Sequence, residues 1–412
     1  MLKKRLAQFG PGLLYAGAAV GVSHLVQSTR AGAEFGFQLL IVVIVINLIK
    51  YPVFEAGPRY AAATGTSLLD GYARIGKWAV WVYLIMSVLT MFIIMAAISI
   101  VTAGLFAQLL EIQADAQFVA CFLLFLSVVI LGFGQYSTLD KLMKFIVILL
   151  TISTLAALIF ASLEPSIQLP EFATQFDWGN RMHVLFLAAL IGWMPAPIDI
   201  SIWHSMWSVS KFKERGEVIP LKTVLLDFKI GYWGTTFLAV AFVGLGALVL
   251  YGTGQQLEEG SVGFAGQLIN MYTSNLGQWA FPFIALAAFT TMFSTLLTCL
   301  DAFPRTLRRS SALLFDKLSE KKHHSKLYWF WIILTALGTS FILLFFLSSM
   351  RSMVDLATTM SFVIAPVLAV LNYIALNGKT APMEGRQPIW LRIANIVSIA
   401  LLTAFSLWFL YY

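Results

Sequence analysis

The residues best suited to binding chemistry lie inside apolar stretches long enough to cross a membrane. Asp199 follows the segment 192–198 (Gly-Trp-Met-Pro-Ala-Pro-Ile), close to the middle of one such stretch. An ionisable side chain at that depth is costly unless it is paired, hydrated or used. Because it comes just after Pro197, its carboxylate could ligate a cation or cap a helix that restarts there. We expect Asp199 to take part in binding, and capping is compatible with that role.

A second group of polar residues interrupts the first apolar stretch, which reads Gly-Ala-Ala-Val-Gly-Val-Ser-His over residues 17–24. Gly21 and Ser23 offer backbone and hydroxyl oxygens. His24 is a cation ligand when neutral and a proton carrier when it titrates, although a buried histidine is also a common packing residue. His204, five residues beyond Asp199, is a further candidate for a proton path.

The segment before Asp199 also supplies candidate ligands for a metal. Met194 carries a soft thioether, which suits transition metals, but methionine equally fills gaps in packed cores. Ala196 and Pro197 would expose backbone carbonyls if the helix is broken there.

Hydroxyl side chains gather in the stretch 290–298 (Thr-Thr-Met-Phe-Ser-Thr-Leu-Leu-Thr). Thr291, Ser294 and Thr295 would form a sodium site if they face broken backbone of the first apolar stretch. They could equally bond to the backbone of their own helix.

Composition identifies the solvent of this chain as lipid. Of 412 residues, 59% are hydrophobic and only 11% are charged, and the mean hydropathy is +0.83. Repeated apolar runs of roughly 20 residues predict an all-α membrane protein, because backbone groups in lipid must be satisfied within a helix or a closed barrel. The two cysteines, Cys121 and Cys299, lie in apolar runs, so a disulfide framework is not expected.

We expect about eleven spanning helices. The predicted ranges are 11–29, 36–57, 77–107, 116–134, 141–163, 182–207, 225–251, 277–300, 327–348, 353–376 and 389–411. The basic start of the chain resembles a signal peptide, but its apolar stretch contains Gly10, Pro11, Gly17 and Gly21 and is needed for the repeat described below.

The charges predict the orientation in an inner or plasma membrane. Most of the 27 Lys and Arg residues fall in alternate connections, including a long loop over 301–326, and Arg30, Arg181 and Arg351 are the few on the other side. This asymmetry places the N-terminus in the cytoplasm and the C-terminus outside. It also explains the net charge of +7 without nucleic acid. Lys50, Glu55, Asp227 and Lys229 are expected near inner helix ends, where snorkelling or mutual pairing accommodates them.

Spans 1 and 6 are interrupted at corresponding places, by glycines in the first and by Pro195 and Pro197 in the second. Two broken helices five spans apart predict a five-plus-five inverted repeat with a binding site at mid-membrane. A single transmembrane domain would then consist of a first repeat over 11–163, a second over 182–376 and an additional helix over 389–411.

Motifs for enzymatic chemistry are missing from the sequence. It contains no Gly-rich phosphate loop, no His-Glu-x-x-His and no Cys-x-x-Cys. We therefore expect a transporter that is driven by an ion gradient and needs no resident cofactor.

The chain resembles the natural-resistance-associated macrophage protein (NRAMP) family of divalent-metal transporters. The resemblance lies in Gly10-Pro11-Gly12, in residues 31–40 (Ala-Gly-Ala-Glu-Phe-Gly-Phe-Gln-Leu-Leu) and in Trp203-His204-Ser205. It implies a leucine-transporter-type fold with discontinuous helices 1 and 6, and import of manganese or iron by symport with protons. The implied partners are the metal ion and the lipid bilayer.

The departures from the family pattern fall at the metal site. The family's Asp-Pro-Gly-Asn motif in span 1 reads Gly21-Val22-Ser23-His24 here, so its carboxylate is missing. In span 6 the family has Met-Pro-His. A gapless alignment places residues 197–199 (Pro-Ile-Asp) there, and matching Met194-Pro195 requires a three-residue shift.

Two hypotheses for the cargo follow from these departures. In the first, Asp199 replaces the lost carboxylate and His24 replaces the asparagine, and the cargo is a divalent cation of the manganese and iron class, with magnesium open. In the second, the same scaffold carries a small organic solute or anion with sodium. A third reading, a receptor or scaffold that transports nothing, leaves the two broken helices unexplained.

Overall fold

The computed structural model describes residues 10–133, 136–163, 169–318, 320–381 and 383–412, and every regular element in these ranges is a helix. The basic residues 3–5, which contributed to the predicted orientation, lie outside the described ranges. The α-helices are α2 (Pro11–Ala19), α3 (Thr29–Phe35), α4 (Leu40–Thr64), α5 (Leu68–Ile75), α6 (Lys77–Leu109), α7 (Ala116–Gly132), α8 (Tyr136–Leu163), α9 (Arg181–Trp193), α10 (Asp199–Arg215), α11 (Leu221–Val249), α12 (Ser261–Leu276), α13 (Phe281–Leu314), α14 (Lys321–Phe345), α15 (Met350–Asn377) and α16 (Ile389–Tyr411). A π-helix, η1 (Ser23–Ser28), precedes α3, and short 3-10 turns are η2 (Pro170–Phe172), η3 (Gln278–Ala280), η4 (Asp316–Leu318) and η5 (Met383–Gly385).

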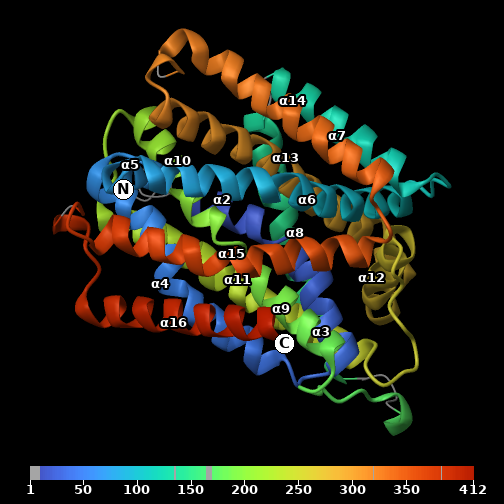
Figure 1. Cartoon of the computed structure of the whole chain (residues 1–412). Helices are drawn as coiled ribbons and strands as arrows, with labels where there is room; N and C mark the ends of the chain where they lie inside the picture. The colour runs from blue at the N-terminus through green and yellow to red at the C-terminus, as the bar shows by residue number, and fades with distance from the viewer. Residues whose placement is uncertain (1–9, 134–135, 164–168, 319, 382) are drawn as a thin grey trace, which may run out of the picture.

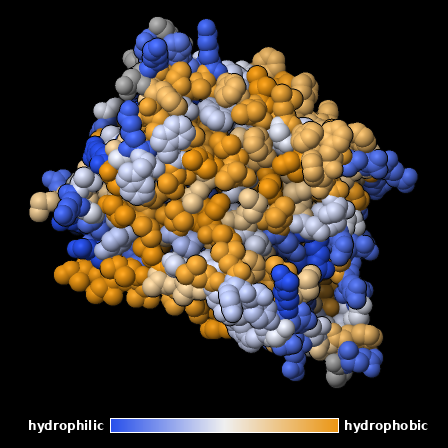
Figure 2. Space-filling model, in the orientation of Figure 1, coloured by the Kyte–Doolittle hydropathy of each residue, from blue (hydrophilic) through white to orange (hydrophobic). Residues whose placement is uncertain are grey.

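The helices form one membrane-spanning bundle. Among the described residues, seven helices are long and apolar enough to cross a membrane, and three shorter apolar helices accompany them. Hydrophobic side chains cover the middle of the face in Figure 2, and hydrophilic ones gather toward its edges. Helices α7 and α14 lie along one edge of the bundle and α16 along the opposite edge, whereas α2 lies inside it (Figure 1). The prediction of an all-helical membrane protein is confirmed.

The predicted spans correspond in order to α2 with η1 and α3, then α4, α6, α7, α8, α9 with α10, α11, α13, α14, α15 and α16. Two further helices, α5 and α12, lie in connections. Ser67 and Asp70 form a capping box at the start of α5, because each side chain meets the other's backbone.

The prediction of a long inner loop over 301–326 is wrong. Helix α13 continues to Leu314, and α14 already begins at Lys321. Asp301 accepts a hydrogen bond of 2.6 Å from Arg305 Nε one turn later, and Arg309 pairs with Asp70 of α5. These ion pairs let the apolar helix continue as a polar one past the end of the predicted span.

Both predicted interruptions are present. Helix α9 ends at Trp193 and α10 begins at Asp199, because Pro195 and Pro197 lack the N–H groups that would continue the helix. In span 1, α2 ends at Ala19 and the chain resumes as η1 after Val20 and Gly21. The break in span 1 is narrower than the predicted interruption over residues 17–24, since Ser23 and His24 already belong to η1. A side chain at Gly21 would collide with Thr295, because an added Cβ would lie 2.9 Å from its Oγ1.

Two charged residues differ from the sequence prediction. Lys50 does not snorkel to the membrane surface, because it is fully buried against α9. Asp227 accepts a hydrogen bond of 2.7 Å from Gly12 N and so caps the start of α2. Glu55 pairs with Arg59 at 3.0 Å, as mutual pairing predicts. The difference arises because packing between distant helices, which one sequence does not display, decides where a long side chain can point.

Candidate functional site

An open vestibule of about 770 Å³ leads into the bundle from one end. Its walls come from α3, from α9 and the segment before it, from the segment after α11, and from the start of α15. Arg30 and Asp355 lie at its base, where Arg30 Nη1 is 2.6 Å from Asp355 Oδ1. Arg30 is only 2% exposed and also donates to Gln27 Oε1 at 3.1 Å. This ion pair joins span 1 to span 10 across the vestibule floor.

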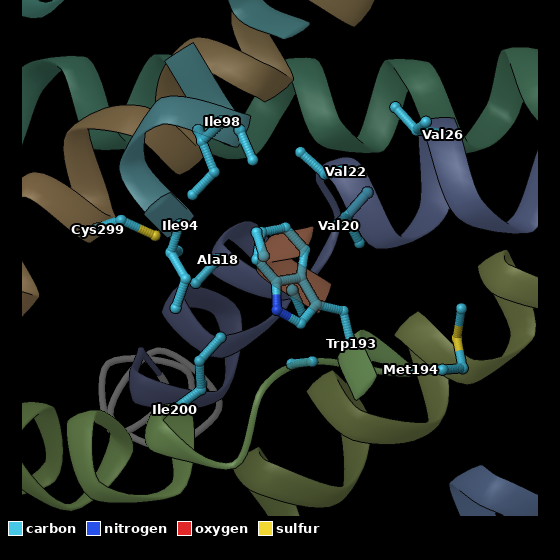
Figure 3. Packing of buried hydrophobic residues seen from close by; sticks show 14 of the residues in the cluster. Ala18, Val20, Val22, Val26, Ile94, Ile98, Trp193, Met194, Ile200 and Cys299 are labelled. Carbon is cyan, nitrogen blue, oxygen red and sulfur yellow. The ribbon is translucent and has the colours of Figure 1, made fainter. Parts of the chain in front are cut away.

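A small cavity of about 20 Å³, room for about one water molecule, lies between the two broken helices. Its lining residues are Ala18, Ala19, Val22, Ser23, Ile94, Ile98, Trp193, Pro197, Ile200, Trp203, Thr295 and Cys299. In Figure 3 the indole of Trp193 lies between Ala18, Val20 and Ile94. Trp193 Nε1 donates to Ser361 Oγ at 2.7 Å, which fixes the ring in place. The cavity is therefore largely apolar and aromatic, with hydroxyl groups from Ser23 and Thr295.

Ser23 connects the two breaks. Its hydroxyl lies 2.7 Å from Ala19 O, 3.4 Å from Pro195 O and 2.8 Å from His24 Nδ1. A hydroxyl has one proton to donate, so these three acceptors exceed the donors that Ser23 provides. A cation or an additional proton would balance this excess.

His24 is fully buried, and its Nε2 lies 2.9 Å from Thr235 O. Because a carbonyl only accepts, we assign the proton to Nε2, and Nδ1 then accepts from Ser23 when the ring is neutral. Both ring nitrogens are thus engaged by the protein. If the ring gains a proton, Nδ1 donates to Ser23 Oγ, and the Ser23 hydroxyl is released to donate to Ala19 O.

Asp199 is 7% exposed and is the first residue of α10. It is not among the residues that line the cavity, and its electrostatic neighbours are Tyr72, Tyr83 and Cys299. No hydrogen bond between Asp199 and His24 occurs among the described residues. The two members of the hypothetical relocated metal site therefore belong to separate groups of contacts in this conformation.

The other candidates from span 6 are divided in the same way. Pro197 lines the cavity, whereas Met194 and Ala196 are fully buried outside it. Figure 3 shows the Met194 side chain apart from the residues around the Trp193 indole. His204 packs against Tyr15 and Phe228, with ring centroids 6.1 and 5.6 Å away, and its Nδ1 is 3.3 Å from Ser208 Oγ.

Two of the three hydroxyls proposed for a sodium site lie beside the break in span 1. Thr295 Oγ1 lies 3.2 Å from Gly17 O and 3.4 Å from Val20 O, so α13 contacts the carbonyls freed by the break in span 1. Thr291 instead donates to Ala287 O of its own helix at 2.7 Å. Ser294 faces Gly17, since an added Cβ on Gly17 would lie 4.0 Å from its Oγ. Neutral oxygens gathered in this way suit a hard monovalent cation.

A conventional transition-metal site is not visible in the described part of the chain, where no three His, Cys, Asp or Glu residues are grouped to hold a metal ion.

The residues that line the vestibule and the cavity include some that the sequence did not single out. Arg30 was expected in an outer connection but is buried in α3, and its partner Asp355 was not singled out. Opposite charges near the ends of spans 1 and 10 were the only available signal. Trp193 and Trp203, which line the cavity, carried no polar signal at all.

Two interrupted helices around a small cavity, within a bundle of apolar helices, are features of a membrane transporter. A family model described as natural resistance-associated macrophage protein-like matches residues 12–412. The chain belongs to this family, and it is accordingly a transporter and not an enzyme.

Individual proteins are similar to this chain in sequence or in fold. An uncharacterised protein of Pasteurella multocida is 36% identical, over 98% of this chain and 92% of its own. A mutant of the manganese transporter of Eremococcus coleocola is similar in structure, with a TM-score of 0.71 and 14% identity, over 98% of this chain and 86% of that one. The structure of MhsT in complex with L-phenylalanine matches with a TM-score of 0.61 and 14% identity, over 98% of this chain and 97% of that one. The leucine-transporter-type fold is thereby confirmed.

Proposed function

We propose that this protein is a secondary active transporter that moves its cargo by alternating access around the cavity between α2 with η1 and α9 with α10. The observation that carries this proposal is the pair of broken helices, joined at mid-membrane through the Ser23 hydroxyl and Pro195 O. The vestibule on one side of the cavity and the Arg30–Asp355 pair between them supply an entrance and a gate. The orientation proposed from the charges makes this the outer side.

The first candidate cargo is a divalent metal cation of the manganese and iron class, accompanied by protons. Family membership and the similarity to a manganese transporter support it. The excess of acceptors around Ser23 would favour a positive charge at the junction of the two breaks. In this proposal Gly21, Met194, Ala196 and Pro197 supply backbone or thioether ligands after a local rearrangement. Asp199 supplies the carboxylate, and His24 and His204 carry protons.

Uptake of radioactive manganese into proteoliposomes tests this candidate. We expect saturable uptake that is lost in Asp199→Ala. The matched control is Asp115→Ala, because Asp115 lies immediately before α7, is exposed and makes no side-chain cap. Unchanged uptake in Asp199→Ala would show that Asp199 is not a metal ligand. Absence of manganese uptake in the wild-type protein would reject manganese as the cargo.

The second candidate is a small organic solute or anion carried with sodium. The lining of the cavity favours it, because two tryptophan rings and aliphatic side chains offer an apolar surface and no lining residue is a carboxylate. Thr295 against Gly17 O and Val20 O supports sodium binding at the same time. The N-terminus of α10 would then attract a carboxylate of the solute.

The sodium site is tested by thermal unfolding of the purified protein in sodium chloride and in choline chloride. We expect sodium to raise the midpoint in the wild-type protein and not in Thr295→Val. The matched control is Thr290→Val, since Thr290 lies on the same helix but donates only to Leu286 O and Ala287 O. A panel of amino acids and small carboxylates, added with sodium, then identifies the solute. Equal sodium responses in Thr295→Val and Thr290→Val would reject this site.

A further inference from the structure

Lys50 is a fully buried lysine in the interior of α4. Its Nζ lies 2.6 Å from Ile191 O and 2.9 Å from Gly192 O, and both carbonyls belong to the last turn of α9. The ammonium group therefore contacts the broken span directly at the point where its first half ends.

These carbonyls are available because of the break. Within a continuous helix Ile191 O would accept from the N–H of residue 195, but that residue is proline and has none. Gly192 O would accept from residue 196, which lies beyond the end of α9. The end of a helix also carries a partial negative charge, so two unpaired carbonyls there attract a cation.

The charge of Lys50 is not neutralised by a nearby carboxylate among the described residues, where its ammonium donates to Ile191 O and Gly192 O. The buried Arg30 and Arg59, by contrast, are paired with Asp355 and Glu55. On the other side of the same break, Asp199 occupies the first position of α10, where the helix end is partially positive. The two ends of broken span 6 thus carry fixed charges that oppose their dipoles.

We infer that Lys50 is a tethered cation that permanently occupies the carbonyl end of α9 and fills the position that a bound cation would otherwise take. A cargo or coupling cation must then bind elsewhere, at the Ser23 junction or beside Thr295. The inference deepens the proposed transport function by restricting where cations bind, but it requires only the broken helix and not the identity of the cargo.

Chemical rescue tests this role in the purified full-length protein without any transport measurement. In Lys50→Ala, loss of the side chain leaves space and two unpaired carbonyls, so methylammonium should bind there and raise the unfolding midpoint. With methylammonium at about ten times its dissociation constant, linkage predicts a rise on the order of 1–3 °C. The wild-type protein should show no such rise.

Two further variants test whether stabilisation by methylammonium depends on the space and the unpaired carbonyls left by removal of the Lys50 side chain. Lys50→Met keeps a long apolar side chain without the charge, so it should be destabilised and gain nothing from methylammonium. Lys229→Ala removes an exposed lysine from α11 and should behave like the wild-type protein. A methylammonium response in Lys50→Ala that equals the wild-type response, or a Lys50→Met protein as stable as wild type, would overturn the inference.

The wild-type protein provides a measurement that does not depend on variants folding. Mass spectrometry after brief treatment of proteoliposomes with a permeant acetylating reagent should find Lys50 protected and Lys229 modified, and both modified after denaturation. Acetylation of Lys50 in the folded protein at the same rate as Lys229 would show that the ammonium leaves the carbonyls, which contradicts permanent occupation.

Discussion

The substitution Asp355→Asn removes one charge from the ion pair at the base of the vestibule while keeping the shape of the side chain. In the structure Asp355 accepts from Arg30 Nη1 at 2.6 Å, from Arg30 Nη2 at 3.3 Å and from Gln27 Nε2 at 3.2 Å. Because these contacts join span 1 to span 10, they stabilise the state in which the floor of the vestibule is closed. We expect the substitution to shift the protein toward states in which the floor is open.

The size of the shift follows from burial. Breaking a buried ion pair costs about 3–5 kcal/mol. Asp355 is 34% exposed, and Arg30 retains Glu34 at 3.4 Å, so screening and the second partner reduce the cost. About 1–2 kcal/mol remains, which corresponds to roughly a 5–30-fold change in the ratio of open to closed states.

Cys299 reports this change, because it lines the cavity beyond Arg30 and is only 3% exposed. In a Cys121→Ser background, the rate at which a small methanethiosulfonate reagent modifies Cys299 should rise by about the same factor in Asp355→Asn. The matched control is Glu171→Gln, which removes a carboxylate from the vestibule wall. A rate equal to that of the wild-type protein, or an equal rise in Glu171→Gln, would refute the assignment of this ion pair as a gate.

Three other substitutions test the packing around the site. Gly192→Ala should lower the free energy of unfolding by about 1–3 kcal/mol in denaturant titrations, because the new Cβ collides with Thr358 O, whereas Gly234→Ala, with open space, should not. Asp227→Ala should cost about 1–2 kcal/mol, measured in the same way, because Gly12 N loses its cap, and a stability equal to that of wild type would show that water replaces the carboxylate. Trp193→Ala should enlarge the cavity and destabilise the protein by about 3–5 kcal/mol, and added indole should restore part of that stability; absence of any indole effect would mean that the cavity collapses.

Local features of the sequence were sufficient to predict the scaffold. Apolar runs predicted the spans, and the chemistry of Pro195 and Pro197 predicted the end of α9 and the start of α10 at Asp199. These features are local because a helix needs only its own backbone donors, and proline removes one wherever it occurs. The extension of α13 to Leu314 was missed, since its polar turns are stabilised partly by Arg309 pairing with Asp70, more than two hundred residues away in the chain.

The contents of the site could be predicted only in part. Ser23 and Thr295 were chosen for their hydroxyls, and both contact freed carbonyls of the broken spans. Asp199 and His24 were expected together, but the sequence could not reveal that His24 bonds to Thr235 O while Asp199 lies in the electrostatic surroundings of Tyr72 and Tyr83. Neither residue type nor spacing indicates the direction of a side chain once a helix is broken.

The sequence by itself determined that this chain crosses a membrane repeatedly and that two of its helices are interrupted. Hydrophobic runs, glycines and prolines have these effects on the backbone at their own positions, whatever the rest of the fold. Only the tertiary structure decided what meets the interrupted backbone. Lys50, Thr295 and Ser23 reach those carbonyls from positions that are near in space, although in each of the three contacts more than a hundred residues separate the partners along the chain. The partner of an unpaired carbonyl in lipid is set by whichever donor the packing brings within about 3 Å, and packing is a property of the whole bundle.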